Sequence, residues 1–224
     1  MRGDDFSNRI VDDIYEDNLL DETLVKMADI RHGESEADIL NVHEGRADYN
    51  LTEKGHTQAK LMAEFVSKNY NINKIYVSTL KRAVQTATHL SERIGIPIII
   101  DDMLMEFNNG LLAGLSREEA DIKYPKIDNL PIDQSVYGQE TRVDFRKRAE
   151  IAFERIIKEN DSDTTVAIVS HGGMINQLYH VFLGLPIESK IFFGTGDTGI
   201  HEWILKEERY ILKANLLEHI MEIK

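Results

Sequence analysis

The sequence predicts a three-layer α/β/α sandwich built around a mostly parallel β-sheet, with a small cap region. Short apolar runs alternate with amphipathic segments of helical period from residue 24 to residue 184. Such alternation is typical of parallel sheets that helices cover on both faces. With 224 residues, 42% of them hydrophobic, the chain is long enough to bury a sizeable core in one domain.

Local signals place the elements in order along the chain. The expected strands are residues 24–30, 74–78, 96–100 and 164–170, and the expected helices between and after them are residues 51–70, 80–95, 141–160 and 172–184. Thr52 is the expected N-cap of the first of these helices, and Gly95 ends the second. Residues 200–205 and 210–217 flank a polar turn and are expected to close the sheet as a strand pair.

Two stretches depart from this alternation. Residues 1–22 are acidic with scattered apolar side chains, and we expect an N-terminal extension that forms a docking helix. Residues 102–139 are loop-rich and contain a short helix opened by a capping box of Ser116 and Glu119. Because long irregular connections in compact domains are usually functional, this second stretch is expected to cap the site of a catalytic domain spanning residues 23–224.

Composition excludes several classes of protein. The formal net charge is −13 and the isoelectric point is about 5.1, which argues against nucleic acid or an anionic membrane as a partner. The sequence has no cysteine, so it has no disulfide framework, thiolate metal site or cysteine nucleophile. It also lacks an apolar leader and any run of about 18 apolar residues, so a cytoplasmic protein is expected.

The candidate site residues follow three of the expected strands. Arg31 and His32 follow the first strand, Ser78 and Arg82 the second, and His171 the last. Ligands of parallel sheets bind where the carboxyl ends of strands meet, so these side chains are expected to converge. A lone histidine at a strand end is more often an ordinary polar residue, and only the convergence indicates a site.

The chemistry of these residue types points to a phosphate group. Arginine binds phosphate oxygens through a planar fork, and a neutral imidazole is a competent nucleophile toward phosphorus. Glycines that follow His32 and His171 let backbone N–H groups approach the same anion.

Five stretches together resemble the histidine phosphatase superfamily, the phosphoglycerate-mutase-like enzymes: RHGES, YVSTLKRAVQTA, EFNNGLLAG, GQETRVDFRKR and VSHGG. They occur in the family's order across about residues 24–205, and GRADYNLTEKGHTQA is similar to the family's stretch after the first motif. The resemblance implies that His32 forms a phosphohistidine while Arg31, Arg82 and His171 hold the transferring phosphoryl group. It also implies that Glu106 protonates the leaving oxygen and then activates water.

The resemblance extends to the rest of the phosphate site. It adds as substrate-binding residues Ser35, Asp38, Gly45, Gly172, Asp197 and Thr198. No metal or cofactor is expected, because cationic side chains supply the electrostatic stabilisation. Asp38 and Asp197 stand where asparagine is common in the family. Either they face the pocket and favour a substrate that carries an ammonium group, or they point to solvent or pair with Arg46 or His201.

Three functions stay open on this fold. A phosphatase of small phosphorylated metabolites is favoured over a mutase, because only 65 positions separate Glu106 from His171, whereas family mutases usually carry a longer insertion there. A non-catalytic phosphate-binding protein is disfavoured because His32 and Glu106 are both present. A homodimer is left open. The GTGDTG run at residues 194–199 is not a dinucleotide motif, since a strand and not a helix is expected after it.

Overall fold

The computed structural model describes residues 25–160 and 163–221, which form a layered α/β fold around a six-stranded sheet. The strands are β1 (Val25–Arg31), β2 (Lys74–Ser78), β3 (Ile98–Asp101), β4 (Thr164–Ser170), β5 (Ile200–Leu205) and β6 (Arg209–Leu216). Their order is β3-β2-β4-β1-β5-β6. The first four in this order are parallel, β5 is antiparallel to β1, and β6 is antiparallel to β5. The predicted mostly parallel sheet is confirmed; the predicted extension, residues 1–22, lies outside the described residues.

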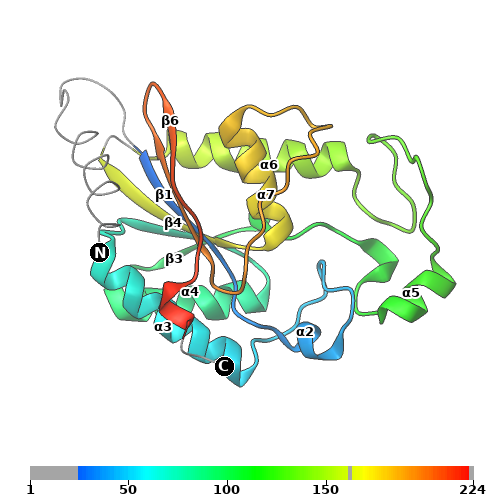
Figure 1. The fold of residues 1–224 in the computed structure, drawn as a ribbon, viewed down its shortest axis with the longest axis horizontal. Coiled ribbons are helices and arrows are strands. Elements are labelled where there is room, and N and C mark those ends of the chain that lie inside the picture. The colour runs from blue at the N-terminus through cyan, green and yellow to red at the C-terminus, as the bar shows by residue number, and fades with distance from the viewer. Residues whose placement is uncertain (1–24, 161–162, 222–224) are drawn as a thin grey trace, which may run out of the picture.

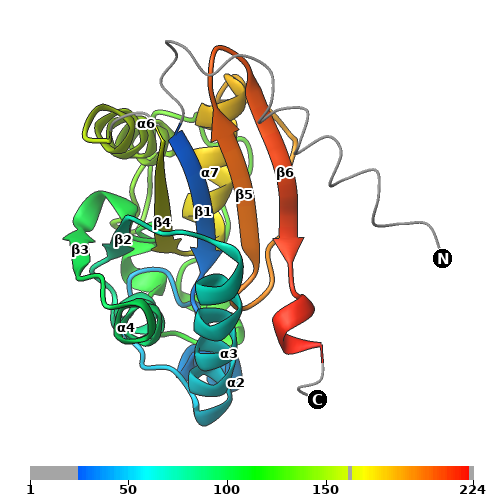
Figure 2. The same cartoon turned by 90° about the vertical axis from the view of Figure 1, so that its left-hand side faces the viewer.

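Two pairs of helices cover the two faces of the sheet (Figure 2). Helices α3 (Glu53–Asn69) and α4 (Lys81–Ile94) pack on one face, and α6 (Arg142–Lys158) and α7 (Gly172–Leu183) pack on the other. Thr52 caps α3 as predicted, because its Oγ1 accepts a hydrogen bond from the Gly55 N–H at 2.9 Å. Gly95 ends α4 in the left-handed conformation at φ 75°, which glycine adopts without a steric penalty.

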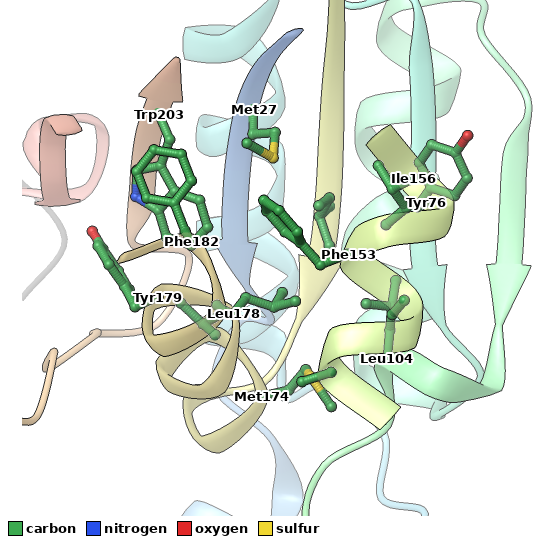
Figure 3. Close-up of a cluster of buried hydrophobic side chains, with 14 of the residues drawn as sticks. Met27, Tyr76, Leu104, Phe153, Ile156, Met174, Leu178, Tyr179, Phe182 and Trp203 are labelled. Atoms are coloured by element: carbon green, nitrogen blue, oxygen red, sulfur yellow. The ribbon is translucent and has the colours of Figure 1, made fainter. Parts of the chain in front are cut away.

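The strands alternate between two cores because successive side chains point to opposite faces. Met27 of β1 joins the cluster under α6 and α7, whereas its neighbour Ala28 joins the cluster under α3 and α4. In the first cluster Trp203 of β5 stacks on Phe182 of α7 with ring centroids 5.0 Å apart (Figure 3). Burying side chains of this size contributes roughly 1.5–3 kcal/mol each, so this packing fixes the sheet whose strand ends carry the site.

Short helices lie beyond the carboxyl end of β1 (Figure 1). These are α2 (Glu36–Leu40), α5 (Arg117–Lys123) and the 3₁₀ turns Asp102–Leu104 and Gly110–Leu112; another 3₁₀ turn, Glu218–Ile220, follows β6. The predicted capping box of α5 is present, with Ser116 Oγ accepting from the Glu119 N–H at 3.2 Å. Helix α2 was not predicted, because its five residues are too few to show a helical period. An isolated bridge between Val42 and Ser116 joins the segment after α2 to the start of α5. No helix in the described part of the chain is long and apolar enough to cross a membrane.

Candidate active site

His32 lies at the carboxyl end of β1, between β4 and the loop that leads into β5. Its backbone N–H donates to Ser170 O at 3.0 Å, and its carbonyl accepts from the Thr198 N–H at 3.2 Å. Its ring Nδ1 lies 2.7 Å from Gly33 O. Because a carbonyl oxygen only accepts, Nδ1 carries the proton and Nε2 carries the lone pair. The backbone therefore fixes both the position and the tautomer of this imidazole.

The imidazole of His32 is buried in a cationic setting. Burial, Arg82 and Arg31 lower the pKa of His32 well below its usual value, so the ring is neutral at pH 7. A neutral imidazole with a free lone pair on Nε2 is the form that attacks phosphorus.

Arg82, in the first turn of α4, is fully buried and faces His32. Its Nε lies 3.2 Å from His32 Nε2 and 3.1 Å from Glu44 Oε1. Its two terminal nitrogens donate to the carbonyls of Ala47, at 3.0 Å, and Gly45, at 2.8 Å. The guanidinium is thereby held against the lone pair of His32 Nε2.

His171 is the N-cap of α7 and is also fully buried. Its Nε2 lies 2.7 Å from Ser78 Oγ, and its ring centroid lies 5.1 Å from that of His32. Burial and Arg82 are the main causes that lower the pKa of His171 well below its usual value. Its Nδ1 has no hydrogen-bond partner among the described residues. A buried polar nitrogen of this kind is costly unless a ligand completes it. An anion oxygen does so in the tautomer in which Ser78 Oγ donates to Nε2 and Nδ1 carries the proton.

Arg31 reaches the same site from the last position of β1. It donates from Nη1 to Thr195 O at 2.9 Å, and its Nη2 lies 3.5 Å from Asp197 Oδ1. Its Nε is buried and has no hydrogen-bond partner among the described residues. Asp197 thus pairs with Arg31, and with neither Arg46 nor His201. Since Glu44 contacts Arg82, each of the two arginines has its own carboxylate, and the site is less cationic than the sequence indicated.

Glu106 faces these groups from the loop after the 3₁₀ turn Asp102–Leu104. Its Oε2 accepts from the Gly173 N–H at 2.9 Å, and its Oε1 accepts from the Phe107 N–H at 2.8 Å. It borders a pocket of about 360 Å³ that is lined by Arg31, His32, Glu44, Glu106, Gly172, Gly173, Phe192, Phe193, Gly194 and Thr195. A carboxyl group therefore lines the same pocket as the His32 imidazole.

A buried ion pair holds the loop that carries Glu106. Arg148 of α6 donates to the carbonyls of Met103 at 2.8 Å, Met105 at 2.6 Å and Glu106 at 2.8 Å. It also makes a two-pronged contact with Glu140 at 3.0 and 2.8 Å. A planar arginine fork can hold several carbonyls at once, so this side chain fixes the path of the loop.

The other predicted binding residues play different parts. Gly172 lines the pocket. Gly45 holds Arg82 through its carbonyl and has φ +48°, and a Cβ there would lie 1.9 Å from Asn109 Oδ1, so a larger residue would be strained and would displace the Asn109 side chain. The Thr198 N–H donates to the His32 carbonyl at 3.2 Å and so helps to hold the backbone of His32. Asp38 is exposed and caps α2, its Oδ2 accepting from the Ser35 N–H at 2.8 Å.

Sequence reasoning missed Glu44, an acidic side chain that lies within 4 Å of the His32 imidazole. Its Oε2 lies 3.7 Å from His32 Nε2, and its Oε1 lies 2.5 Å from Ser35 Oγ. The signal was available, because Glu44 directly precedes the GRADYNLTEKGHTQA stretch. It also missed Arg148, although this residue ends the GQETRVDFRKR motif, and Thr195, whose carbonyl receives Arg31.

Comparisons with known proteins give a matching family model and several relatives. A family model described as the histidine phosphatase superfamily (branch 1) matches residues 30–215. Phosphoserine phosphatase 1 of Hydrogenobacter thermophilus is 31% identical over 205 residues, covering 89% of this chain and 96% of that protein. Glucosyl-3-phosphoglycerate phosphatase of Mycolicibacterium vanbaalenii is 32% identical over 169 residues, covering 71% and 75%. A solved structure titled mycobacterial hydrolase 1 superposes with a TM-score of 0.77 at 26% identity, covering 87% of this chain and 99% of that one.

Proposed function

The chain belongs to the histidine phosphatase superfamily, and we propose that it hydrolyses phosphate monoesters of small molecules through a phosphohistidine on His32. The observation that carries the proposal is the state of the His32 ring. Its Nδ1 proton is bound by Gly33 O, and its Nε2 lone pair points to Arg82 in a pocket that Glu106 also lines.

In the first half of the reaction, His32 Nε2 attacks phosphorus as the bond from phosphorus to the ester oxygen breaks. Arg31, Arg82 and His171 bind the three outer oxygens, where negative charge spreads in the transition state. The unpartnered Arg31 Nε and His171 Nδ1 support this assignment, since both are buried nitrogens that would face a bound anion, and His171 Nδ1 donates in the tautomer in which Ser78 Oγ donates to Nε2. Glu106, as the neutral acid, gives its proton to the leaving alkoxide.

In the second half, water replaces the alcohol in the pocket. Glu106, now a carboxylate, takes a proton from this water. The oxygen of the water attacks phosphorus at the same time, and the phosphorus–nitrogen bond to His32 breaks. Inorganic phosphate leaves, and both side chains return to their starting protonation states. The hydrogen bond that Gly173 donates to Glu106 supports this role, because it keeps the carboxyl group facing the pocket in both halves.

The proposed substrates are small phosphorylated metabolites, in keeping with the phosphoserine and glucosyl-3-phosphoglycerate named for the relatives. The carboxylate of Asp197 could bind the ammonium group of a substrate only after leaving Arg31. The carboxylate of Asp38 already accepts the Ser35 N–H in the cap of α2. A cytoplasmic location stays a prediction from the sequence, and a homodimer stays open.

Hydrolysis of a phosphomonoester panel by the wild type and by His32→Ala tests the proposal. We expect phosphate release by the wild type with several small substrates and none above background by the variant. Incubation with 3-phosphoglycerate and catalytic bisphosphate distinguishes a mutase: isomerisation of the phosphoglycerate faster than phosphate release would overturn the hydrolase assignment.

A further inference from the structure

The side chain of Glu44 lies directly beside the place that a phosphate group needs. Its Oε1 lies 3.1 Å from Arg82 Nε, and its Oε2 lies 3.7 Å from His32 Nε2. A phosphoryl group bonded to that nitrogen and held by that arginine must place an oxygen beside the Glu44 carboxyl group. Glu44 is 19% exposed and lines the pocket, so substrate meets it directly.

The cationic groups around Glu44 do not neutralise both the Glu44 carboxylate and a phosphate group bound beside it. Arg82 from α4 is the cation in direct contact, and Arg31 at the end of β1 is already paired with Asp197. Asp38 of α2 adds negative charge nearby, His32 is neutral, and Glu106 borders the same pocket. Burial raises the pKa of Glu44 and outweighs the opposing effect of Arg82. A phosphate dianion would make the charged form of Glu44 less stable still.

The position of Glu44 is fixed by more than its ion pair. Ser35, which is fully buried, has its hydroxyl 2.5 Å from Glu44 Oε1. Gly45, the next residue, is held by the Arg82 side chain through its carbonyl. Glu44 is therefore anchored on both sides, and neutralising its charge requires less rearrangement than moving it out of the pocket.

We propose that Glu44 determines how the pocket binds its anion: it takes up one proton from solvent when a phosphate dianion binds, and its O–H then donates to a phosphate oxygen. On release of phosphate the proton returns to solvent. The inference rests on the proposed function only in placing a tetrahedral anion beside His32. It assigns Glu44 a role in substrate affinity, separate from the acid and base steps of Glu106.

The proposal has a direct consequence for affinity. Where free Glu44 is ionised, the dissociation constant of a dianion should rise up to tenfold for each unit of pH. Glu44→Gln supplies a neutral N–H donor of the same shape, so it should bind a dianion more tightly than the wild type at neutral pH. This advantage should vanish in acid, where the wild-type carboxyl group is already protonated.

Calorimetric binding of tungstate, a tetrahedral dianion that does not titrate in this range, tests the proposal. Titrations at pH 7.5 in two buffers of different ionisation enthalpy give the number of protons taken up. We expect the wild type to take up about one proton more than Glu44→Gln, with the exposed-carboxylate control Glu64→Gln matching the wild type. Glu44→Ala serves as a second variant that also lacks the titrating group.

Each remaining outcome is decisive. Equal proton uptake by the wild type and both Glu44 variants would overturn the inference while leaving the phosphate site intact. Weaker binding by Glu44→Gln at neutral pH would also overturn it. If tungstate binds none of these proteins and does not compete with substrate, both this inference and the proposed function fail.

Discussion

Glu106 and Gly173 meet at the first turn of α7, where the Glu106 Oε2 accepts the Gly173 N–H at 2.9 Å. A Cβ built on Gly173 would lie 2.3 Å from Glu106 Oε1, so the carboxyl group occupies the space that any side chain there would take. The orientation of the proposed acid thus depends on a residue without a side chain on a different element. This contact and the hydrogen bonds from Arg148 both hold Glu106, so substitutions at Gly173 and Arg148 test whether its position matters for catalysis.

Replacing Glu106 should slow the hydrolysis of different substrates to different extents, according to how much protonation the leaving group needs. Glu106→Gln is expected to slow hydrolysis of alkyl phosphates by about 10²–10⁴-fold, the usual contribution of a positioned acid. An activated aryl phosphate needs little protonation and should lose much less in the phosphorylation step. Single-turnover rates for both substrates measure the difference, and equal losses would indicate a structural role for Glu106.

Adding a methyl group at Gly173 should act through Glu106. Gly173→Ala is expected to lower kcat for alkyl phosphates by roughly 10- to 100-fold, because small misplacements of a reacting group have effects of this size. A double-mutant cycle provides the control: on a Glu106→Gln background the further loss should nearly disappear. Fully additive losses would contradict this account.

Arg148→Lys should loosen the loop that carries Glu106. A lysine keeps the charge but cannot bind three carbonyls and Glu140 together, so we expect roughly 1–3 kcal/mol lower stability. The folded variant should lose at least about tenfold on alkyl phosphates and less on an activated aryl phosphate. Arg142→Lys, on the exposed start of α6, should leave both properties unchanged. An equal loss on both substrates would show that Arg148 does not act on the acid.

Asp29 should make the protein less stable as the pH rises. It is fully buried on β1 opposite His201, its two oxygens have no partner among the described residues, and burial raises its pKa well above the usual value. The folded protein therefore keeps a proton that the unfolded chain releases above about pH 4. Wild-type stability should fall from that pH toward the folded pKa, whereas Asp29→Asn should lack this fall.

Chemical denaturation at several pH values measures this effect. The stability of Asp29→Asn relative to the wild type should grow with pH by up to about 1.4 kcal/mol per unit. Asp121→Asn, at an exposed carboxylate, should follow the wild-type profile. A constant difference between Asp29→Asn and the wild type across this range would contradict the buried, protonated state.

The sequence allowed most of the fold to be predicted because its signals are local. Residues 74–78 and 164–170 form β2 and β4 as expected, since each is a short apolar run bounded by polar residues. The Thr52 cap and the Ser116 capping box depend on hydrogen-bonding groups within three residues of each other. The order of strands could not be derived in this way, because it depends on which packing of the helices buries most apolar surface.

Part of the site was predictable because strand ends determine it. Arg31 ends β1, His32 follows β1 and His171 follows β4, so topology alone brings these three residues together. Two contacts depend instead on the paths of loops far apart in sequence: the one between Arg31 and Asp197, and the one between Glu44 and Arg82. No periodicity or spacing encodes such a path, which is why the pairing of each arginine with its carboxylate became visible only in the structure.

The central claim is a covalent phosphohistidine on His32. Rapid quenching in alkali followed by mass spectrometry tests this claim most directly. Wild-type enzyme mixed with an activated aryl phosphate and denatured in alkali within milliseconds should carry one phosphoryl group, stable to base and lost in acid. Peptide mapping should place it on His32, and His32→Ala should carry none. A phosphoryl group on another residue, or undiminished turnover by His32→Ala, would contradict the account.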